Sequence, residues 1–233
     1  MDRELFDHFL RDDARRGPVP DDAFTGAAGG AACGDLSRLS LSIDGGRIAS
    51  VTFDTEGCGA TRAATAALAE TVERATVLEA AKLSIDDAEG LLGGLELPKR
   101  HAAQLATDAL HRALSAAAAS SLPLDPSTAL GVGPDTATLN ASEGGSVRSP
   151  ERVAVAVSGG VDSAVAALLE RERGADVVAI TVKLWADPET DGTKACCSPE
   201  AVLGARAVAH SLDIPHFTLD LEADFRRRVV DRF

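Results

Sequence analysis

The sequence of 233 residues contains no tyrosine, one tryptophan and one methionine, and aromatic residues make up only 3% of it. Single-stranded nucleic acids bind by stacking on aromatic side chains, so a protein built on such platforms is not expected. Long apolar runs are also missing, since no stretch approaches the ~20 residues of a membrane-spanning helix. The charged opening MDRELFDHFLRDDARR does not resemble a signal peptide. We therefore expect a cytoplasmic protein that does not associate with membranes.

Positive charge and cysteine are scarce as well. There are 23 Lys and Arg against 36 Asp and Glu, a net charge of −13. A general basic coat for nucleic acid is thereby excluded, and any contact with nucleic acid must be local. The four cysteines are too few for a disulfide scaffold in a chain of this length, and in a reducing compartment they fit metal-binding, persulfide or buried-thiol roles better.

The length corresponds to about one and a half domains at ~150 residues per domain. Composition changes near residue 117, where a stretch rich in Ala, Ser, Pro, Gly and Thr begins and hydrophobic periodicity ends. Such a segment gains little from burial, so we predict a flexible linker over residues 117–150. It would separate a first domain, residues 1–116, from a second and incomplete domain, residues 151–233.

Patterns in the first domain predict strands followed by helices, the order of a small α+β fold. Alternating residues in 36–43 predict a strand with Leu39, Leu41 and Ile43 facing inward, and a return strand at 47–55 would follow the turn at 44–46 with Val51 and Phe53 inward. The glycine-rich segment before them, residues 25–35, reads as a loop. Helices are expected near 5–11, in the Ala-rich segment after 57, after Ser84, and from Leu97 to about Ala117.

The second domain alternates strands at 153–157, 176–182 and 216–221 with helical segments. This order predicts a parallel, Rossmann-like α/β sheet with right-handed crossovers. The first strand, VAVAV, is apolar throughout, as expected for a strand buried on both faces.

A glycine-rich hexapeptide, SGGVDS at Ser158–Ser163, links the first strand of this domain to its first helix. Glycines allow a close backbone approach to an anion, and a helix N-terminus presents free N–H groups and a positive dipole end. The Gly-Lys-Ser/Thr ending of a Walker A loop is missing. The hexapeptide in this context resembles the pyrophosphate (PP) loop of the ATP pyrophosphatases. A tight turn without a ligand is the plainer alternative.

The segments AVSGGVDSAVAALL, VVAITVKLWADPETDG and CCSPEAVLGARAVAHSLDIPHFTLDLEADF together resemble the first part of the tRNA-specific 2-thiouridylases, the MnmA family. The resemblance implies an enzyme that uses ATP to adenylate the C2 oxygen of a wobble uridine in tRNA. A cysteine persulfide then delivers sulfur, and AMP leaves. It implies tRNA as a partner, together with a sulfur donor such as a cysteine desulfurase or a sulfur relay protein. The implied ATP-binding residues are Ala156, Val157, Ser158, Gly159, Gly160, Val161, Asp162, Ser163 and Val182, with Asp162 as a candidate Mg²⁺ ligand.

This family's catalytic cysteines would fall beyond Phe233, so we expect no catalytic residue within the chain and no thiolation by it alone. Cys196 and Cys197 precede a predicted helix N-terminus, which favours a reactive thiol, but ordinary loop or buried thiols remain the alternative. Another ATP pyrophosphatase also stays open as an assignment.

Three segments of the first domain, GGAACGD, FDTEGCGAT and LPKRHAAQLATDAL, resemble the IscU/NifU-type iron–sulfur scaffolds. The resemblance implies a site made of Cys33, Asp35, Cys58 and His101 that holds an iron–sulfur cluster or Zn²⁺. Ala102 stands where this family has a third cysteine, which favours zinc, since zinc accepts S, N and O donors. A persulfide relay on Cys58 or Cys33, and a degenerate scaffold that only docks a partner, are the alternatives.

The remaining histidines have no ligand-like spacing, and we expect them on the surface or partly buried; they are His8, His111, His210 and His216. The combined expectation is a scaffold-like domain fused to the start of a thiouridylase. The alternative is an iron–sulfur scaffold or carrier with a vestigial ATP-binding domain.

Overall fold

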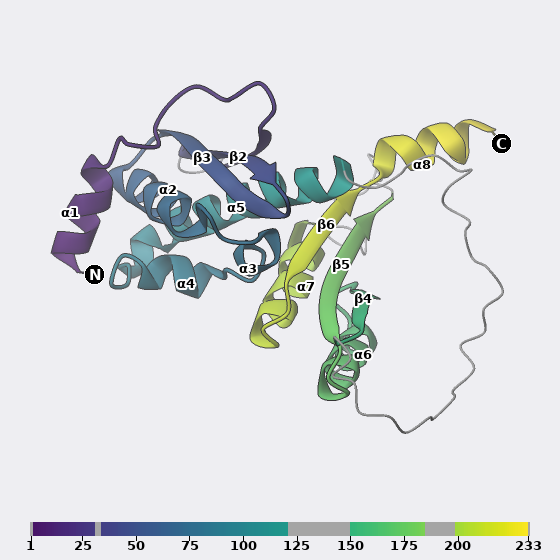
Figure 1. Ribbon diagram of the computed structural model, residues 1–233. Coiled ribbons are helices and arrows are strands. Elements are labelled where there is room, and N and C mark those ends of the chain that lie inside the picture. Colours follow the sequence, from purple (N-terminus) through teal and green to yellow (C-terminus); the bar gives the residue numbers. More distant parts are fainter. Residues whose placement is uncertain (1, 31–33, 121–149, 185–198, 233) are drawn as a thin grey trace.

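The computed structural model describes residues 2–30, 34–120, 150–184 and 199–232, which form two units with one three-stranded sheet each (Figure 1). The first unit contains α1 (Arg3–Arg11), β1 (Phe24–Gly29), β2 (Leu36–Asp44), β3 (Arg47–Glu56), α2 (Gly59–Val72), α3 (Val77–Ala80), α4 (Ile85–Gly90), η1 (Leu97–Lys99) and α5 (Arg100–Ser120). The second contains β4 (Arg152–Ala156), α6 (Val161–Glu172), β5 (Asp176–Lys183), α7 (Pro199–Ser211), β6 (His216–Asp220), α8 (Glu222–Arg228) and η2 (Val230–Arg232). Within the described ranges, none of the helices combines the length and hydrophobicity that crossing a membrane requires.

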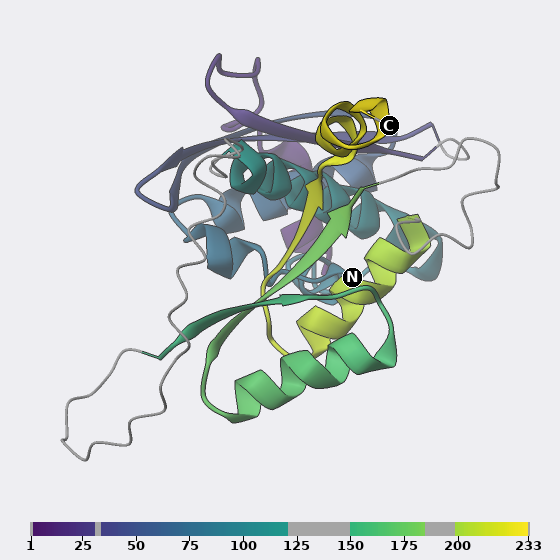
Figure 2. The same cartoon turned by 90° about the vertical axis from the view of Figure 1, so that its right-hand side faces the viewer.

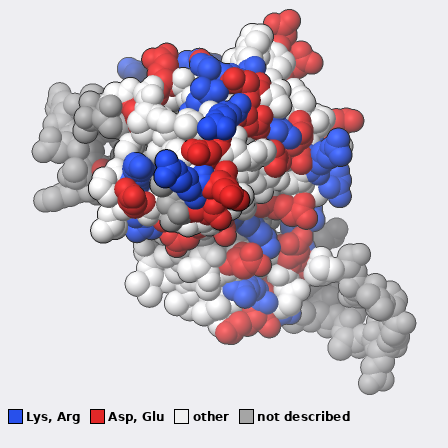
Figure 3. Space-filling view, turned by 90° about the vertical axis from the view of Figure 1, so that its left-hand side faces the viewer, with Lys and Arg blue, Asp and Glu red and all other residues white. Residues whose placement is uncertain are grey.

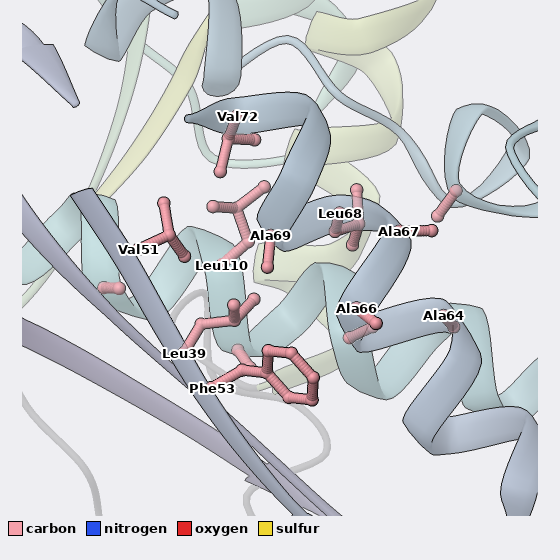
Figure 4. Packing of buried hydrophobic residues seen from close by; sticks show 14 of the residues in the cluster. Leu39, Val51, Phe53, Ala64, Ala66, Ala67, Leu68, Ala69, Val72 and Leu110 are labelled. Carbon is pink, nitrogen blue, oxygen red and sulfur yellow. The ribbon is translucent and has the colours of Figure 1, made fainter. Parts of the chain in front are cut away.

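The sheet of the first unit is antiparallel, with the strand order β1-β2-β3, and α2 and α5 pack against it. Figure 4 shows side chains of β2 and β3, among them Leu39 and Phe53, pointing at α2 and at Leu110 of α5. Leu39, Leu41, Val51 and Phe53 are buried, as their alternation predicts, while Ile43 is only partly buried. The α+β class predicted for this part is confirmed.

β1 is the element that the sequence analysis misses, because residues 24–29 were expected to lie in or before a loop. FTGAAG has little strand propensity, and its position is set by packing against α5. A Cβ on Gly26 would lie 2.1 Å from the carbonyl oxygen of Ala109, so only glycine lets the strand approach the helix this closely. β1 also explains why Ser40 of β2 is buried, since the Ser40 hydroxyl hydrogen-bonds Thr25 of β1 at 2.9 Å.

The second unit is a parallel sheet with the order β4-β5-β6, which confirms the Rossmann-like α/β class. Figure 2 shows its three strands fanned beside α6 and α7; α6 packs on β4 and β5, and α7 on β5 and β6. The expectation that the first strand is buried on both faces is wrong. Ala154 and Ala156 are exposed, because β4 is an outer strand of the described sheet and these two residues lie on the face of β4 that α6 does not cover.

The two units pack together through α5 and α7 and along β6. Phe217 of β6 belongs to the hydrophobic core of the first unit, and Arg206 of α7 forms an ion pair with Asp108 of α5 at 2.6 Å. The prediction that the histidines are at most partly buried is wrong for two of them, since His111 and His216 are 2% and 1% exposed. Both lie where the two units meet, and a local sequence pattern does not reveal a contact between distant segments.

Candidate functional site

Asp35, Cys58 and His101 come from three separate segments and meet at one end of the first unit. Asp35 precedes β2, Cys58 is the N-cap residue of α2, and His101 lies in the first turn of α5. Their potential ligand atoms, a carboxylate oxygen, Sγ and a ring nitrogen, all lie within 4.8 Å of one another. Asp35 is buried and Cys58 is exposed, so the cluster is anchored on one side and open on the other.

Asp35 is the centre of the hydrogen-bond network. Its Oδ1 accepts from the backbone N–H of Cys58 at 3.0 Å, and its Oδ2 accepts from the Thr61 hydroxyl at 2.7 Å and faces His101 Nε2 at 3.2 Å. Burial acts to raise the pKa of Asp35, but the hydrogen bonds from Cys58, Thr61 and His101 outweigh it and lower this pKa to about 2. The carboxylate is therefore ionised, as a metal ligand must be.

His101 is oriented by a second contact. Its Nδ1 lies 2.9 Å from the carbonyl oxygen of Pro98, which can only accept, so Nδ1 carries a proton. Nε2 faces the cluster, and it can bind a metal ion there only after giving up the proton that it donates to Asp35 in the absence of metal. Metal-bound histidines are commonly held in this way by a hydrogen bond from the other ring nitrogen.

Gly57 allows Asp35 to approach Cys58. Its φ of +106° lies in a region that side chains avoid, and a Cβ there would lie 2.0 Å from Asp35 Oδ1. The sequence pattern does not predict this role of Gly57. The contribution of Thr61 was missed, although its position one turn after Cys58 on a predicted helix was a usable signal.

The site opens into a surface hollow lined by Phe6, Lys99 and Ala60 besides the three candidate ligands and Gly59. Lys99 Nζ lies 5.9 Å from the ring centroid of Phe6, so the hollow also has a positive charge in its lining. Figure 3 shows the α1 side of the molecule, where acidic and basic side chains are interspersed.

The donor set fits a zinc-type ion, since carboxylate, thiolate and imidazole are all zinc ligands and a fourth position stays open to another donor. Cys33, the fourth residue of the predicted set, lies outside the described residues. Ala102, in place of a third cysteine, is fully buried in α5 and leaves one thiol among the described donors.

The predicted ATP loop lies at the carboxyl end of β4, where open α/β sheets bind ligands. Gly159 has a φ of +81°, and a Cβ on it would lie 3.1 Å from the carbonyl oxygen of Ala201, so the loop turns tightly against α7. The Ser163 hydroxyl accepts from the N–H of Ser158 at 3.3 Å and donates to the Gly160 carbonyl at 3.0 Å.

The loop leads into α6 without a side-chain cap, because its N-cap residue is Gly160. The N–H groups of the first helical turn have no intrahelical acceptors and point out of the helix end. In the parallel register Ala156 pairs with Ile180, so Val182 lies at the same edge of the sheet as the loop. The structure thus brings together all the predicted ATP-binding residues, Ala156–Ser163 and Val182. Cys196 and Cys197 lie outside the described residues.

The two candidate sites lie in different parts of the molecule. Along α5, His101 of the first site and Ser115, which contacts β6, are separated by about 20 Å at 1.5 Å per residue. Figure 1 shows α1 at the left of the first unit and the carboxyl ends of β5 and β6 on its other side.

Comparison with known proteins agrees with this division. The family described as NifU-like N terminal domain matches residues 2–121, more than half of the chain. The chain belongs to this NifU-like family. A second family, described as tRNA methyl transferase HUP domain, matches residues 151–233.

One curated relative is similar over nearly the whole chain, and a second is similar over about a third of it. The chain is 44% identical over 219 residues to the "Bifunctional protein NifU/MnmA" of Rubrobacter xylanophilus, covering 93% of the chain and 42% of that protein. It is 46% identical over 86 residues to the "tRNA-specific 2-thiouridylase MnmA" of Magnetococcus marinus, covering 36% of the chain and 24% of that protein. The chain therefore spans less than half the length of these relatives. Both resemblances seen in the sequence are confirmed: a NifU-like domain precedes an MnmA-like one.

Among solved structures, one from Fervidobacterium islandicum, whose title includes the words "iron-sulfur cluster assembly scaffold protein for SUF system", matches with 22% identity and a TM-score of 0.40. The match covers 48% of the chain and 94% of that structure.

Proposed function

We propose that this chain joins a metal- or sulfur-handling NifU-like domain to the ATP-binding part of a cytoplasmic tRNA 2-thiouridylase. The observation that carries the ATP assignment is the uncapped, glycine-turned loop Ser158–Ser163 at the carboxyl edge of a parallel sheet. The similarity of residues 151–233 to relatives named as tRNA-specific 2-thiouridylases supports the choice of reaction.

Each part of this loop has a role in the proposal. The N–H groups at the start of α6, with the hydroxyl of Ser158, hold the phosphates, while the Ser163 hydroxyl, which donates to the Gly160 carbonyl, keeps the loop in shape. Asp162 is exposed in the first turn of α6 and is the carboxylate placed to hold Mg²⁺. Val182 contacts adenosine through its backbone. Bound ATP would supply the adenylyl group for the C2 oxygen of a wobble uridine in tRNA, and pyrophosphate would leave.

In the NifU-like domain, the proposed role of Asp35, Cys58 and His101 is to hold a divalent ion such as Zn²⁺. The exposed Cys58 thiol, at a helix N-terminus that favours negative charge, is also the candidate persulfide carrier. The Cys58 thiolate would attack the outer sulfur of a persulfide on an external donor, such as a cysteine desulfurase or a relay protein, and the donor would leave as its thiolate. Storage of an iron–sulfur cluster is the second candidate, supported by membership of the NifU-like family. The mixed donors at this site favour the single metal ion.

Isothermal calorimetry with Mg·ATP on the 233-residue chain tests the nucleotide assignment. Asp162→Ala is expected to weaken binding at least tenfold, whereas Asp21→Ala, an exposed carboxylate of the first unit, leaves it unchanged. Equal affinity of wild type and Asp162→Ala, or no binding by wild type, would contradict the proposal.

A further inference from the structure

The contact between the two units covers the outer edge of β6. The N–H of His216 donates to the Ala81 carbonyl at 3.3 Å, and the N–H of Thr218 donates to the Ser115 hydroxyl at 3.1 Å. These two amides point away from β5, because β6 pairs with β5 along its opposite edge. The NifU-like domain thus satisfies donors that an edge strand would otherwise present to solvent.

A pair of histidine rings faces across this junction. His111 of α5 and His210 of α7 have ring centroids 5.1 Å apart. His111 Nε2 lies 2.9 Å from the Leu83 carbonyl, and His210 Nε2 lies 3.2 Å from the Ala81 carbonyl. A carbonyl oxygen only accepts, so each ring carries its proton on Nε2. His111 Nδ1 is buried and has no hydrogen-bond partner among the residues that the structure describes, so a second proton there would have no acceptor.

A third histidine, His216, also carries a proton on Nε2. The Thr181 hydroxyl donates to the Val157 carbonyl at 2.9 Å, so at the 2.9 Å contact between Thr181 Oγ1 and His216 Nε2 the ring nitrogen is the donor. The pKa values of His111, His210 and His216 are all lowered, chiefly by burial and further by the charge of Arg206.

The surrounding charges only partly compensate an added proton. Arg206, the ion-pair partner of Asp108, opposes protonation of the histidines, whereas Asp87 of α4 favours it at His210. Arg112 of α5 adds positive charge near Arg206, and the Lys82–Asp213 pair also spans the two units. Asp108 is already paired with Arg206 at 2.6 Å. A positive charge on either ring of the facing pair would therefore lie next to a guanidinium whose counter-ion is already engaged.

We propose that the junction between the NifU-like domain and the MnmA-like domain is a pH-dependent latch, closed only while His111 and His210 are neutral. Protonation of these rings separates the two units, exposes the edge of β6 and frees the NifU-like domain from α7. The latch does not depend on the proposed function, since it rests on the junction alone.

The expected effect follows from linkage. A histidine that takes up a proton only in the open state, with an ordinary pKa near 6.5, favours opening by about 30-fold at pH 5.0 relative to pH 7.5. His111 and His210 together would favour it by about 1000-fold, if each becomes exposed on opening.

Amide hydrogen exchange followed by NMR tests the latch on the 233-residue chain, with rates corrected for the intrinsic pH dependence. At pH 7.5 the His216 and Thr218 amides are expected to be protected. Toward pH 5.0 their protection falls by at least 30-fold, while the Ala179 amide, bonded to the Pro215 carbonyl inside the parallel sheet, keeps its protection. His210→Gln, which keeps an N–H donor but cannot titrate, retains about 30-fold more protection at pH 5.0 than wild type.

Three results would overturn the proposal. The first is unchanged protection of the His216 and Thr218 amides between pH 7.5 and 5.0. The second is an equal loss of protection in wild type and His210→Gln, and the third is a parallel loss of protection at the Ala179 amide. The last would show ordinary unfolding in place of separation.

Discussion

His101 Nε2 lies 3.2 Å from Asp35 Oδ2, although the two residues are 66 positions apart in the chain. The start of α5 is thus held against the segment before β2, and Cys58 at the start of α2 completes the group. Two helix starts and one strand entrance converge because α2 and α5 pack on the same sheet. The geometry of the site therefore depends on residues that keep these segments close together.

Gly57→Ala is expected to lower the affinity for Zn²⁺ at least tenfold. A methyl group would collide with Asp35 Oδ1, and the positive φ at this position is unfavourable for alanine. Competition with a chromophoric chelator measures the affinity. Gly17→Ala is the matched control, since nothing lies within 4 Å of a Cβ there and its φ is not positive. Unchanged affinity in Gly57→Ala would show that Asp35 does not need its present position.

Leu110→Ala is expected to lower the free energy of unfolding by about 2–5 kcal/mol, the usual cost of a cavity in a packed core. Leu110 is 0% exposed and lies between α5 and the sheet. Leu97→Ala, at a position that is 81% exposed, should change it by less than about 0.5 kcal/mol. Urea denaturation separates the two, and equal effects would contradict the described core.

Two glycines of the MnmA-like domain should respond in opposite directions. Gly204→Ala in α7 is expected to raise the free energy of unfolding by about 0.5–1 kcal/mol, because the position is exposed and helical with nothing within 4 Å of a Cβ. Gly159→Ala should lower it, because φ is +81° and the Ala201 carbonyl is 3.1 Å from the new Cβ. Thermal unfolding compares the two variants. Stabilisation by Gly159→Ala would mean that the loop is not turned as described.

Stability should fall as the pH drops below about 6.5. Burial lowers the pKa of His216 to about 3 and also lowers those of His111 and His210, so in this range the unfolded chain binds protons that the folded chain does not. Above pH 6.5 the three neutral histidines do not reduce the free energy of unfolding. As the pH falls from 6.5 toward the folded-state pKa values, this free energy decreases by about 1.4 kcal/mol per pH unit for each histidine.

Urea midpoints at pH 7.5, 6.0 and 5.0 measure this slope. His216→Gln is expected to reduce it, while His8→Gln, at an exposed position of α1, leaves it unchanged. A flat profile in wild type between pH 7.5 and 5.0 would show that the buried histidines do not control stability.

Much of this architecture could be predicted from local sequence patterns. The alternation at Leu39 and Leu41 predicts which face of that strand is buried, and the βαβ order predicts a parallel sheet. β1 could not, since FTGAAG is a strand only because α5 lies against it. The proposed metal ligands Asp35, Cys58 and His101 are predicted through family resemblance, and no spacing rule joins residues so far apart in the sequence. The burial of His111 depends on a contact between two units, which no local pattern encodes.

Asp35, Cys58 and His101 are proposed to form a divalent-metal site in the NifU-like domain. The most direct test of this proposal is a zinc titration of the 233-residue chain at pH 7.5 against a competing chelator, with wild type beside Cys58→Ser and His101→Ala. One tightly bound zinc per chain in wild type, with at least tenfold weaker binding in both variants, is the predicted result. No bound zinc, or the same affinity in wild type and variants, would contradict the account.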